Sequence, residues 1–335
     1  MRRTHSGGGP MAAALARVTV LGAILCTAVI AVPAALSTTD VPPASSVMWG
    51  MDDNGSSISQ TESGLHRRFA LVREFRRLDQ SFVDSRMTAL ANNGRSLVVS
   101  VKSKTEKGYI KYAAITAGRY DKAFLKGFAA LTALKTRPFF IFQHEPDSTD
   151  AGASCTSSTA KKVCGPQFIA AWDHVYNLAK SHGYQRPIFT WTVTNWGFNR
   201  LTGVRNKYYW PGNSKTDWVG VDAYSGDCTS RWHDSFHDIM SDSIAWLQTN
   251  APRKKILIPE YGATEGSSAT AKPDWFKAIP AALVQPGYTR IKGLVYWNGS
   301  GGRKCNDFQI TTSLASYKAY KALGLTSAMQ MPAPT

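Results

Sequence analysis

The chain has 335 residues, of which 43% are hydrophobic and 19% are charged, and its formal net charge is +16. This length suits one large domain or two ordinary ones, and the absence of an internal repeat or a low-complexity block excludes a repeat array. The excess of positive charge fits a generally solvated surface or a preference for acidic polysaccharides. No nucleic-acid-binding motif accompanies the charge, so we expect no nucleic-acid partner.

The first 37 residues have the pattern of a secretory signal peptide. An uncharged, mostly apolar stretch at 18–32 follows three arginines and is followed by small residues suited to cleavage (Arg2, Arg3 and Arg17; Val32, Pro33, Ala34 and Ala35). The stretch is short for a membrane span, and an uncleaved anchor is the alternative. We therefore expect a secreted, extracellular protein without stable membrane association after cleavage, with a linker at 38–46.

Export permits disulfide bonds, and four cysteines follow the leader. Four cysteines allow three pairings. Cys155 and Cys164 flank a short loop rich in Ser, Thr and Lys, so we expect them to pair, which leaves Cys228 with Cys305. A structural zinc site is the alternative, but the chain has no C-x-x-C pair to support it.

Strand-like and helix-like stretches alternate along the rest of the chain. Apolar stretches predict strands at 47–52, 69–75, 96–101, 138–145, 187–193, 217–222, 256–260 and 293–297. Helices are predicted at 81–92, 120–134, 167–182, 235–249, 272–283 and 314–323, whereas 57–68 is expected to be irregular. Such alternation favours parallel pairing, and eight units predict an α/β fold, a (β/α)8 TIM barrel, over residues 47–325 with a tail at 326–335. An open doubly wound sheet is the alternative, but no GxGxxG loop supports it.

Polar and aromatic residues follow the predicted strands, at the end where barrel enzymes carry their active sites. They are Asp52 and Asp53; Arg76, Arg77 and Asp79; Lys102 and Lys104; His144 and Glu145; Thr194, Asn195 and Trp196; Asp222 and Tyr224; Glu260 and Tyr261; and Trp297 and Asn298. We interpret four of them as loop caps or local ion pairs, namely Asp52, Asp53, Arg77 and Lys104.

Two of the predicted strands deliver a glutamate to this end. Glu145 closes the run FIFQHE and Glu260 closes ILIPE. Two carboxylates in one pocket are the equipment for glycoside hydrolysis. Sugar rings also pack their apolar faces on aromatic side chains, and we assign Trp196 and Trp297 to a substrate cleft. The other aromatic residues near strand ends can equally fill the core.

These motifs resemble glycoside hydrolase family 26, the β-mannanase family of the large retaining (β/α)8 clan, over about residues 47–323. The resemblance implies that Glu145 of His-Glu is the acid/base and that Glu260 is the nucleophile. Tyr224 in DWVGVDAY would hydrogen-bond the nucleophile, and Trp297 in VYWN would lie under the sugar. His144 would contact the sugar or orient a carboxylate.

The same resemblance implies retention of configuration, with carboxyl groups about 5–5.5 Å apart and a raised pKa at Glu145. The partner would be a polysaccharide or oligosaccharide, with no metal or cofactor, and the chain would be a monomer. After His-Glu, family mannanases usually have an Asn-Gly and tryptophan-rich stretch. Here the sequence Pro-Asp-Ser-Thr at 146–149 leads into the Cys155–Cys164 loop instead.

Two other functions remain open. A non-catalytic carbohydrate-binding barrel would lack one of the two carboxylates, yet both are present. A metal-dependent hydrolase would use histidine and carboxylate ligands drawn from His144, Glu145, Asp222, His233 and His237. His233 and His237 are four residues apart, but this HxxxH lacks the glutamate of metalloproteases, and a solvated helix face explains the pair as well.

Overall fold

A computed structural model describes residues 46–52, 57–148, 154–155, 161–201, 203–226, 233–300 and 307–334. Several predictions concern positions outside the described residues: the signal peptide at 1–37, most of the linker, Asp53, Cys228 and Cys305. No helix in the described part of the chain combines the length and apolar character needed to cross a membrane.

The predicted TIM barrel is confirmed. In the described residues, eight parallel strands close into a barrel in the order β1-β10-β9-β8-β7-β6-β3-β2. They are β1 (Met48–Asp52), β2 (Leu71–Arg77), β3 (Ser96–Lys102), β6 (Phe139–Phe142), β7 (Ile188–Thr194), β8 (Trp218–Ser225), β9 (Ile256–Ala263) and β10 (Ile291–Tyr296). A small antiparallel pair follows β3, formed by β4 (Lys104–Thr105) and β5 (Gly108–Tyr109).

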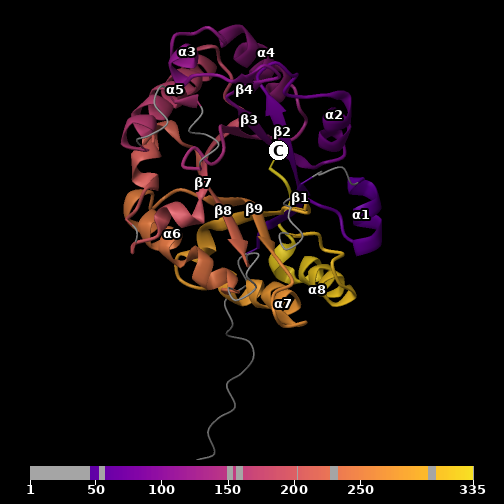
Figure 1. Cartoon of the computed structure of the whole chain (residues 1–335). Helices are drawn as coiled ribbons and strands as arrows, with labels where there is room; N and C mark the ends of the chain where they lie inside the picture. Colours follow the sequence, from indigo (N-terminus) through magenta and orange to yellow (C-terminus); the bar gives the residue numbers. More distant parts are fainter. Residues whose placement is uncertain are drawn as a thin grey trace, which may run out of the picture. The chain divides into compact units, whose positions relative to one another are not determined.

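Helices surround the strands (Figure 1). They are α1 (Ile58–Leu65), α2 (Ser85–Asn92), α3 (Tyr112–Thr116), α4 (Asp121–Thr132), α5 (Lys161–Ser181), α6 (Phe236–Asn250), α7 (Ala271–Leu283) and α8 (Leu314–Leu325). The outward faces of the strands pack against these helices in one large apolar cluster. Both faces of each strand are therefore covered, which explains the nearly continuous apolar runs in the sequence.

The prediction of an irregular segment at 57–68 is wrong, because α1 forms there. Ser57 caps its start, with the hydroxyl accepting a hydrogen bond from the amide of Gln60 at 3.4 Å. His66 ends the helix in a left-handed conformation with φ of 56°. The two caps provide hydrogen-bond partners for backbone N–H and C=O groups at the helix ends, which have no partners within this helix of eight residues.

The barrel interior changes character along its axis. The half toward the amino ends of the strands is filled by a second apolar cluster. Its members in the described strands are Met48, Leu71, Val98, Phe139, Ile141, Ile188, Leu257 and Val295. Because side chains alternate along a strand, the next inward residue after Leu71 is Arg73, and the next after Val98 is Ser100. Polar groups thus begin one layer above the apolar plug, toward the carboxyl ends of the strands.

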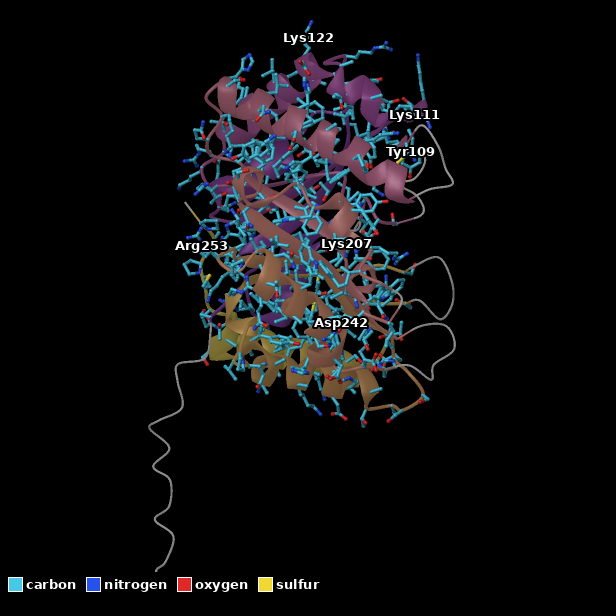
Figure 2. All side chains as sticks on the ribbon, turned by 90° about the vertical axis from the view of Figure 1, so that its left-hand side faces the viewer. Tyr109, Lys111, Lys122, Lys207, Asp242 and Arg253 are labelled. Carbon is cyan, nitrogen blue, oxygen red and sulfur yellow. A yellow bond between two sulfur atoms is a disulfide. The ribbon has the colours of Figure 1, made fainter. Side chains whose placement is uncertain are left out.

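Residues 326–334, predicted to be a tail, pack against the amino ends of the strands. The amide of Val47 donates to the carbonyl of Ala328 at 2.7 Å, and the amide of Arg137 donates to that of Pro334 at 2.9 Å. Figure 2 shows Arg253, which precedes β9, on the opposite side from Tyr109 and Lys111, which follow β3. The tail therefore closes one end of the barrel, and the loops after the strands surround the other.

Candidate active site

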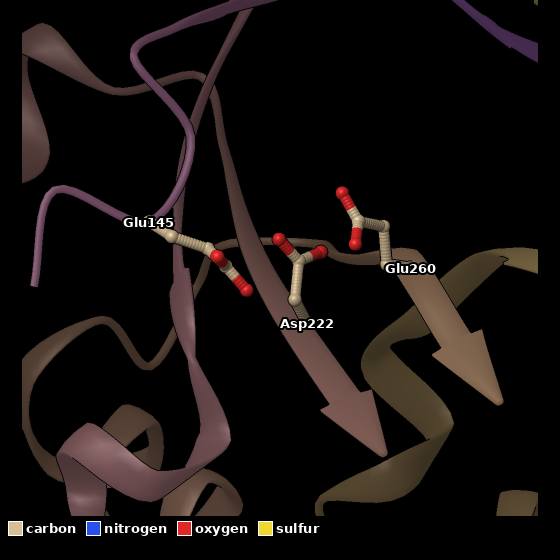
Figure 3. A group of neighbouring side chains, drawn as sticks. All are labelled: Glu145, Asp222 and Glu260. Carbon is tan, nitrogen blue, oxygen red and sulfur yellow. The ribbon is translucent and has the colours of Figure 1, made fainter. Parts of the chain in front are cut away.

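Three carboxylates from different strands meet at the carboxyl end of the barrel. Glu145 follows β6, Asp222 lies on β8 and Glu260 lies on β9. One oxygen of each lies within 4.8 Å of one oxygen of each of the others. Figure 3 shows Asp222 between the two glutamates, with the carboxylates turned toward one another. The structure thus brings together the two glutamates that the sequence singled out.

A strained turn aims Glu145 at this site. The backbone leaves β6 at Phe142, and both Gln143 and Glu145 adopt left-handed conformations, with φ of 48° and 50°. Such conformations are unfavourable for residues other than glycine and persist where surrounding contacts enforce them. Here the amide of Glu145 donates to the carbonyl of Thr192 at 3.0 Å, and the Gln143 side chain accepts two bonds from Ser103.

A buried arginine pairs with two of the three carboxylates. The Nη2 atom of Arg73 lies 2.9 Å from Oε1 of Glu260, and its Nη1 atom lies 3.8 Å from Oδ1 of Asp222. The Arg73 side chain is inaccessible to solvent. Sequence reasoning missed this residue and expected Arg76 and Arg77 at the strand end. The available signal was a charge in the middle of an apolar strand, which must find a partner when buried.

Tyr224 completes the environment of Glu260. Its hydroxyl donates a hydrogen bond to Oε2 of Glu260 at 2.5 Å. Its ring packs edge-on against Trp297 with centroids 6.0 Å apart, and both rings contact Phe308. Each oxygen of Glu260 therefore has its own partner, and the two partners fix the orientation of the carboxylate.

Burial favours the protonated form of the other two carboxyls. It raises the pKa of Glu145 to about 8, and the negative charges of Glu260 and Asp147 add to the effect. Burial also raises the pKa of Asp222 well above its usual range, and the negative charge of Glu260 raises it further. Neither oxygen of Asp222 has a hydrogen-bond partner among the described residues. Below about pH 8 the site therefore holds a protonated Glu145 opposite Glu260, which pairs with Arg73 and accepts a hydrogen bond from Tyr224.

His144 lies beside the carboxylates but bonds to none of them among the described residues. Its ring meets Phe75 edge-on with centroids 5.3 Å apart, and Phe75 also lies under the guanidinium of Arg73. Burial, together with the charges of Arg73 and Lys102, holds the pKa of His144 well below its usual range. The imidazole is therefore neutral, and the predicted contact with a sugar stays a prediction.

The remaining strand-end residues fall into two groups: a candidate sugar-binding residue and residues with structural contacts. Trp196 stands in the turn Asn195–Phe198 after β7 and is 54% exposed, as a sugar platform requires. Asp52 accepts a hydrogen bond from the amide of Asn298 at 2.7 Å, which makes it a loop cap. Arg77 pairs with Asp79 at 3.0 Å. These two interactions agree with the interpretation of Asp52 and Arg77 as structural.

In the ligand set of the alternative metal-dependent hydrolase, Glu145 and Asp222 come together with Glu260, but His233 and His237 do not join them. His233 contacts Thr264 at 3.3 Å, and His237 is exposed and stacks on Tyr288, so neither belongs to the group of carboxylates close enough to share an ion. The guanidinium of Arg73 already supplies positive charge to two of the three carboxylates in that group, Asp222 and Glu260.

The segment after His144-Glu145 is anchored to its neighbours. Asp147 is buried and accepts bonds from the amide and the hydroxyl of Thr194, at 3.2 and 2.5 Å. The predicted disulfide between Cys155 and Cys164 is confirmed, with Cα atoms 5.4 Å apart. Ser154 extends the connection, because its hydroxyl lies 2.7 Å from that of Ser103, the residue that holds Gln143.

Comparisons with known proteins support this architecture. No protein-family model matches the chain, and no curated protein matches its sequence. Among solved structures, it is similar to the GH26 domain of an endo-β-mannanase/endo-β-glucanase from Prevotella bryantii, with a TM-score of 0.58, 12% identity and coverage of 84% of this chain and 90% of that one.

Two further structures agree. A GH26 β-mannanase from Bacteroides ovatus has a TM-score of 0.59 and 11% identity, and the match covers 85% of this chain and 90% of that one. A GH5-4 broad-specificity endoglucanase from an uncultured bacterium has a TM-score of 0.56 and 10% identity, covering 84% and 95%. The chain therefore has the fold of the glycoside hydrolase family 26 mannanases, as its motifs predicted.

Proposed function

We propose that the protein is a retaining glycoside hydrolase that cleaves β-glycosidic bonds of a polysaccharide, a mannan or a related β-glycan. The observation that carries the proposal is the spacing of Glu145 and Glu260, whose nearest oxygens lie within 4.8 Å. Retaining glycosidases hold their two carboxyl groups about 5–5.5 Å apart, whereas inverting enzymes need about 6.5–9.5 Å to admit a water molecule. The raised pKa of Glu145, which suits a proton donor, supports the same conclusion.

In the first step, an oxygen of ionised Glu260 attacks the anomeric carbon of the sugar. The bond between that carbon and the glycosidic oxygen breaks, and protonated Glu145 gives its proton to the departing oxygen. Arg73 and Tyr224 hold the two oxygens of Glu260 and fix its direction of attack. The product of this step is a glycosyl ester on Glu260.

In the second step, Glu145 acts as a base. The Glu145 carboxylate takes a proton from a water molecule, whose oxygen attacks the anomeric carbon and breaks the ester bond to Glu260. Asp222 lies between the two glutamates, and burial raises its pKa well above the usual range, which favours its neutral form. Trp297, beside Tyr224, is positioned to lie under the sugar ring.

The substrate assignment rests on the fold and the aromatic cleft. Two structural neighbours are named as a β-mannanase and a broad-specificity endoglucanase, and we extend the class of mannans and related glycans to this chain. The leader at 1–37 supports secretion, where such polymers are found. We propose a monomer that works outside the cell, without stable membrane association.

The direct test is replacement of each glutamate. Glu145→Gln and Glu260→Gln should each lower kcat on a good substrate by at least about a thousandfold, since each removes an essential group. The substrate is found by a screen of mannans, xylans, β-glucans and acidic polysaccharides. Azide should restore turnover to Glu260→Ala, giving a glycosyl azide of inverted configuration.

Full activity in either glutamine variant would overturn the assignment. Binding of the polysaccharides by the wild-type protein without any hydrolysis would identify a non-catalytic carbohydrate-binding barrel instead.

A further inference from the structure

A polar cavity lies between α1 and α8, and its lining does not include the three carboxylates. Its volume is about 510 Å3, within the range of small-ligand sites. Neutral polar side chains from three parts of the chain line it: Gln60 and Thr61 on α1, Asn298 after β10, Gln309 and Thr311 before α8, and Tyr317 on α8. None of them belongs to the catalytic machinery described above.

The lining is chemically selective. None of the described residues that line the cavity is charged, so these residues offer no charged partner for an ion or a phosphorylated ligand. Most of the side-chain hydroxyl and amide groups make no hydrogen bond within the described part of the protein. Asn298 uses only its Oδ1, which accepts from the amide of Ile310 at 2.9 Å, and its amide donors stay available. A dense set of neutral donors and acceptors beside the ring of Tyr317 matches a sugar, with its hydroxyls and its apolar face.

Gly64 leaves the room that this arrangement needs. A Cβ atom at this position would lie 2.7 Å from the hydroxyl of Tyr317, so the phenol could not keep its place over α1 if residue 64 had a side chain. The backbone conformation of Gly64 does not itself require glycine, because its φ is not positive. The glycine therefore serves the space around Tyr317.

A buried network fixes the wall opposite α1. The ammonium of Lys272 donates to the carbonyl of Gln309 at 2.7 Å and to the hydroxyl of Thr312 at 2.9 Å. The Thr312 hydroxyl also donates to Glu265 at 2.5 Å. Lys272 is inaccessible to solvent, so its hydrogen bonds hold this wall of the cavity from the protein interior. A preformed wall lowers the entropic cost of binding.

The cavity adjoins the catalytic centre through Asn298. This residue follows Trp297, whose ring packs on Tyr224, and Tyr224 bonds Glu260. We propose that the cavity between α1 and α8 binds a neutral sugar unit of the polysaccharide, away from the bond that is cleaved. The proposal rests on the proposed function and adds to it a site that favours long, neutral chains.

The test compares long and short substrates. The variants are Tyr317→Phe, Gly64→Ala, and Gln60→Ala combined with Gln309→Ala. Gln185→Ala is the control, an exposed glutamine just before β7 at the other end of the barrel. The KM for a hexasaccharide should rise about tenfold in each cavity variant, since hydrogen bonds of about 1–1.5 kcal/mol are lost or blocked. The kcat, the KM for a disaccharide and the control should not change.

Binding measured without turnover separates this proposal from the proposed function. Calorimetry is done on Glu260→Gln protein, with β-1,4-linked mannohexaose, cellohexaose and xylohexaose as probes. The affinity for a hexasaccharide should fall by the same tenfold when a cavity substitution is combined with Glu260→Gln. Unchanged affinity for a hexasaccharide that binds, or no binding of any of the three, would overturn the cavity site. Absence of hydrolysis by the wild-type enzyme would overturn the proposed function, while the calorimetry still decides whether the cavity binds sugar.

Discussion

At the scale of single residues, the site works by giving two glutamates opposite environments. Glu260 receives an ion pair from Arg73 and a hydrogen bond from Tyr224. Glu145 is buried and lies close to other carboxyls. Environments that separate the pKa values of two titratable groups assign the roles of acid and nucleophile.

Removal of the Tyr224 hydroxyl isolates one of these contributions. Tyr224→Phe should lower kcat by roughly tenfold to a hundredfold, because a hydrogen bond to a charged group contributes about 1.5–3 kcal/mol. The ring contacts with Trp297 and Phe308 should survive, so the thermal midpoint should change little. Tyr184→Phe, before β7, is the matched control. Unchanged kcat in Tyr224→Phe would show that the bond does not assist the reaction.

The pKa of Glu145 predicts a limit on the alkaline side. Its raised pKa of about 8 keeps the acid protonated below that pH, and the proton is lost as the pH rises through it. For natural substrates, kcat/KM should therefore fall about tenfold per pH unit above about pH 8. Aryl glycosides with an acidic leaving group need no proton, so their profile should lack this limb. The same limb with both substrates would assign it to another group.

The sequence predicted the two glutamates because each ends an apolar run, where a parallel strand delivers its side chain to the active face. Arg73 could not be found in this way, since it lies inside its strand and only the alternation of side chains turns it toward Glu260. Asp222 was recognised as a strand-end residue, but its lack of hydrogen-bond partners among the described residues depends on three strands meeting.

At the scale of elements, the loops after β3, β6 and β7 are joined behind Glu145. Ser103 after β3 bonds both Gln143 and Ser154, and Asp147 bonds Thr194 at the end of β7. These contacts enforce the left-handed turn that carries Glu145. Sequence patterns predicted the strands well but misjudged α1, because its end caps depend on the conformations of Ser57 and His66 rather than on apolar spacing.

The disulfide is the covalent part of this connection. Replacing Cys155 and Cys164 together with alanine should lower the free energy of unfolding by roughly 2–4 kcal/mol, measured by urea denaturation. The kcat should also fall, because Ser154 next to Cys155 supports Ser103. The control is Ala153→Ser, a change two residues before Cys155 that leaves both cysteines in place. Equal unfolding free energies for the double variant and the wild type would contradict a stabilising role.

At the scale of the whole molecule, the apolar core of the barrel interior and the candidate catalytic groups lie toward opposite ends of the barrel. The apolar plug fills the end of the interior that lies toward residues 326–334, and the charged groups begin one layer above it. Closure of the sheet brings strands far apart in the sequence to one mouth, so Glu145 after β6 and Glu260 on β9 meet across β7 and β8. The (β/α)8 architecture was predictable from alternation alone, whereas the distances across the mouth required the closed barrel.

The stereochemistry of the first product tests the central claim most directly. Proton NMR of a hydrolysis reaction, recorded before mutarotation, reports the anomeric configuration of the newly formed reducing sugar. With the carboxylate oxygens of Glu145 and Glu260 within 4.8 Å, no water fits between Glu260 and the sugar, and the first product should keep the β configuration. An α anomer as the first product would contradict the account, because Glu260 would then act as a base or another carboxylate, first of all Asp222, would take its place.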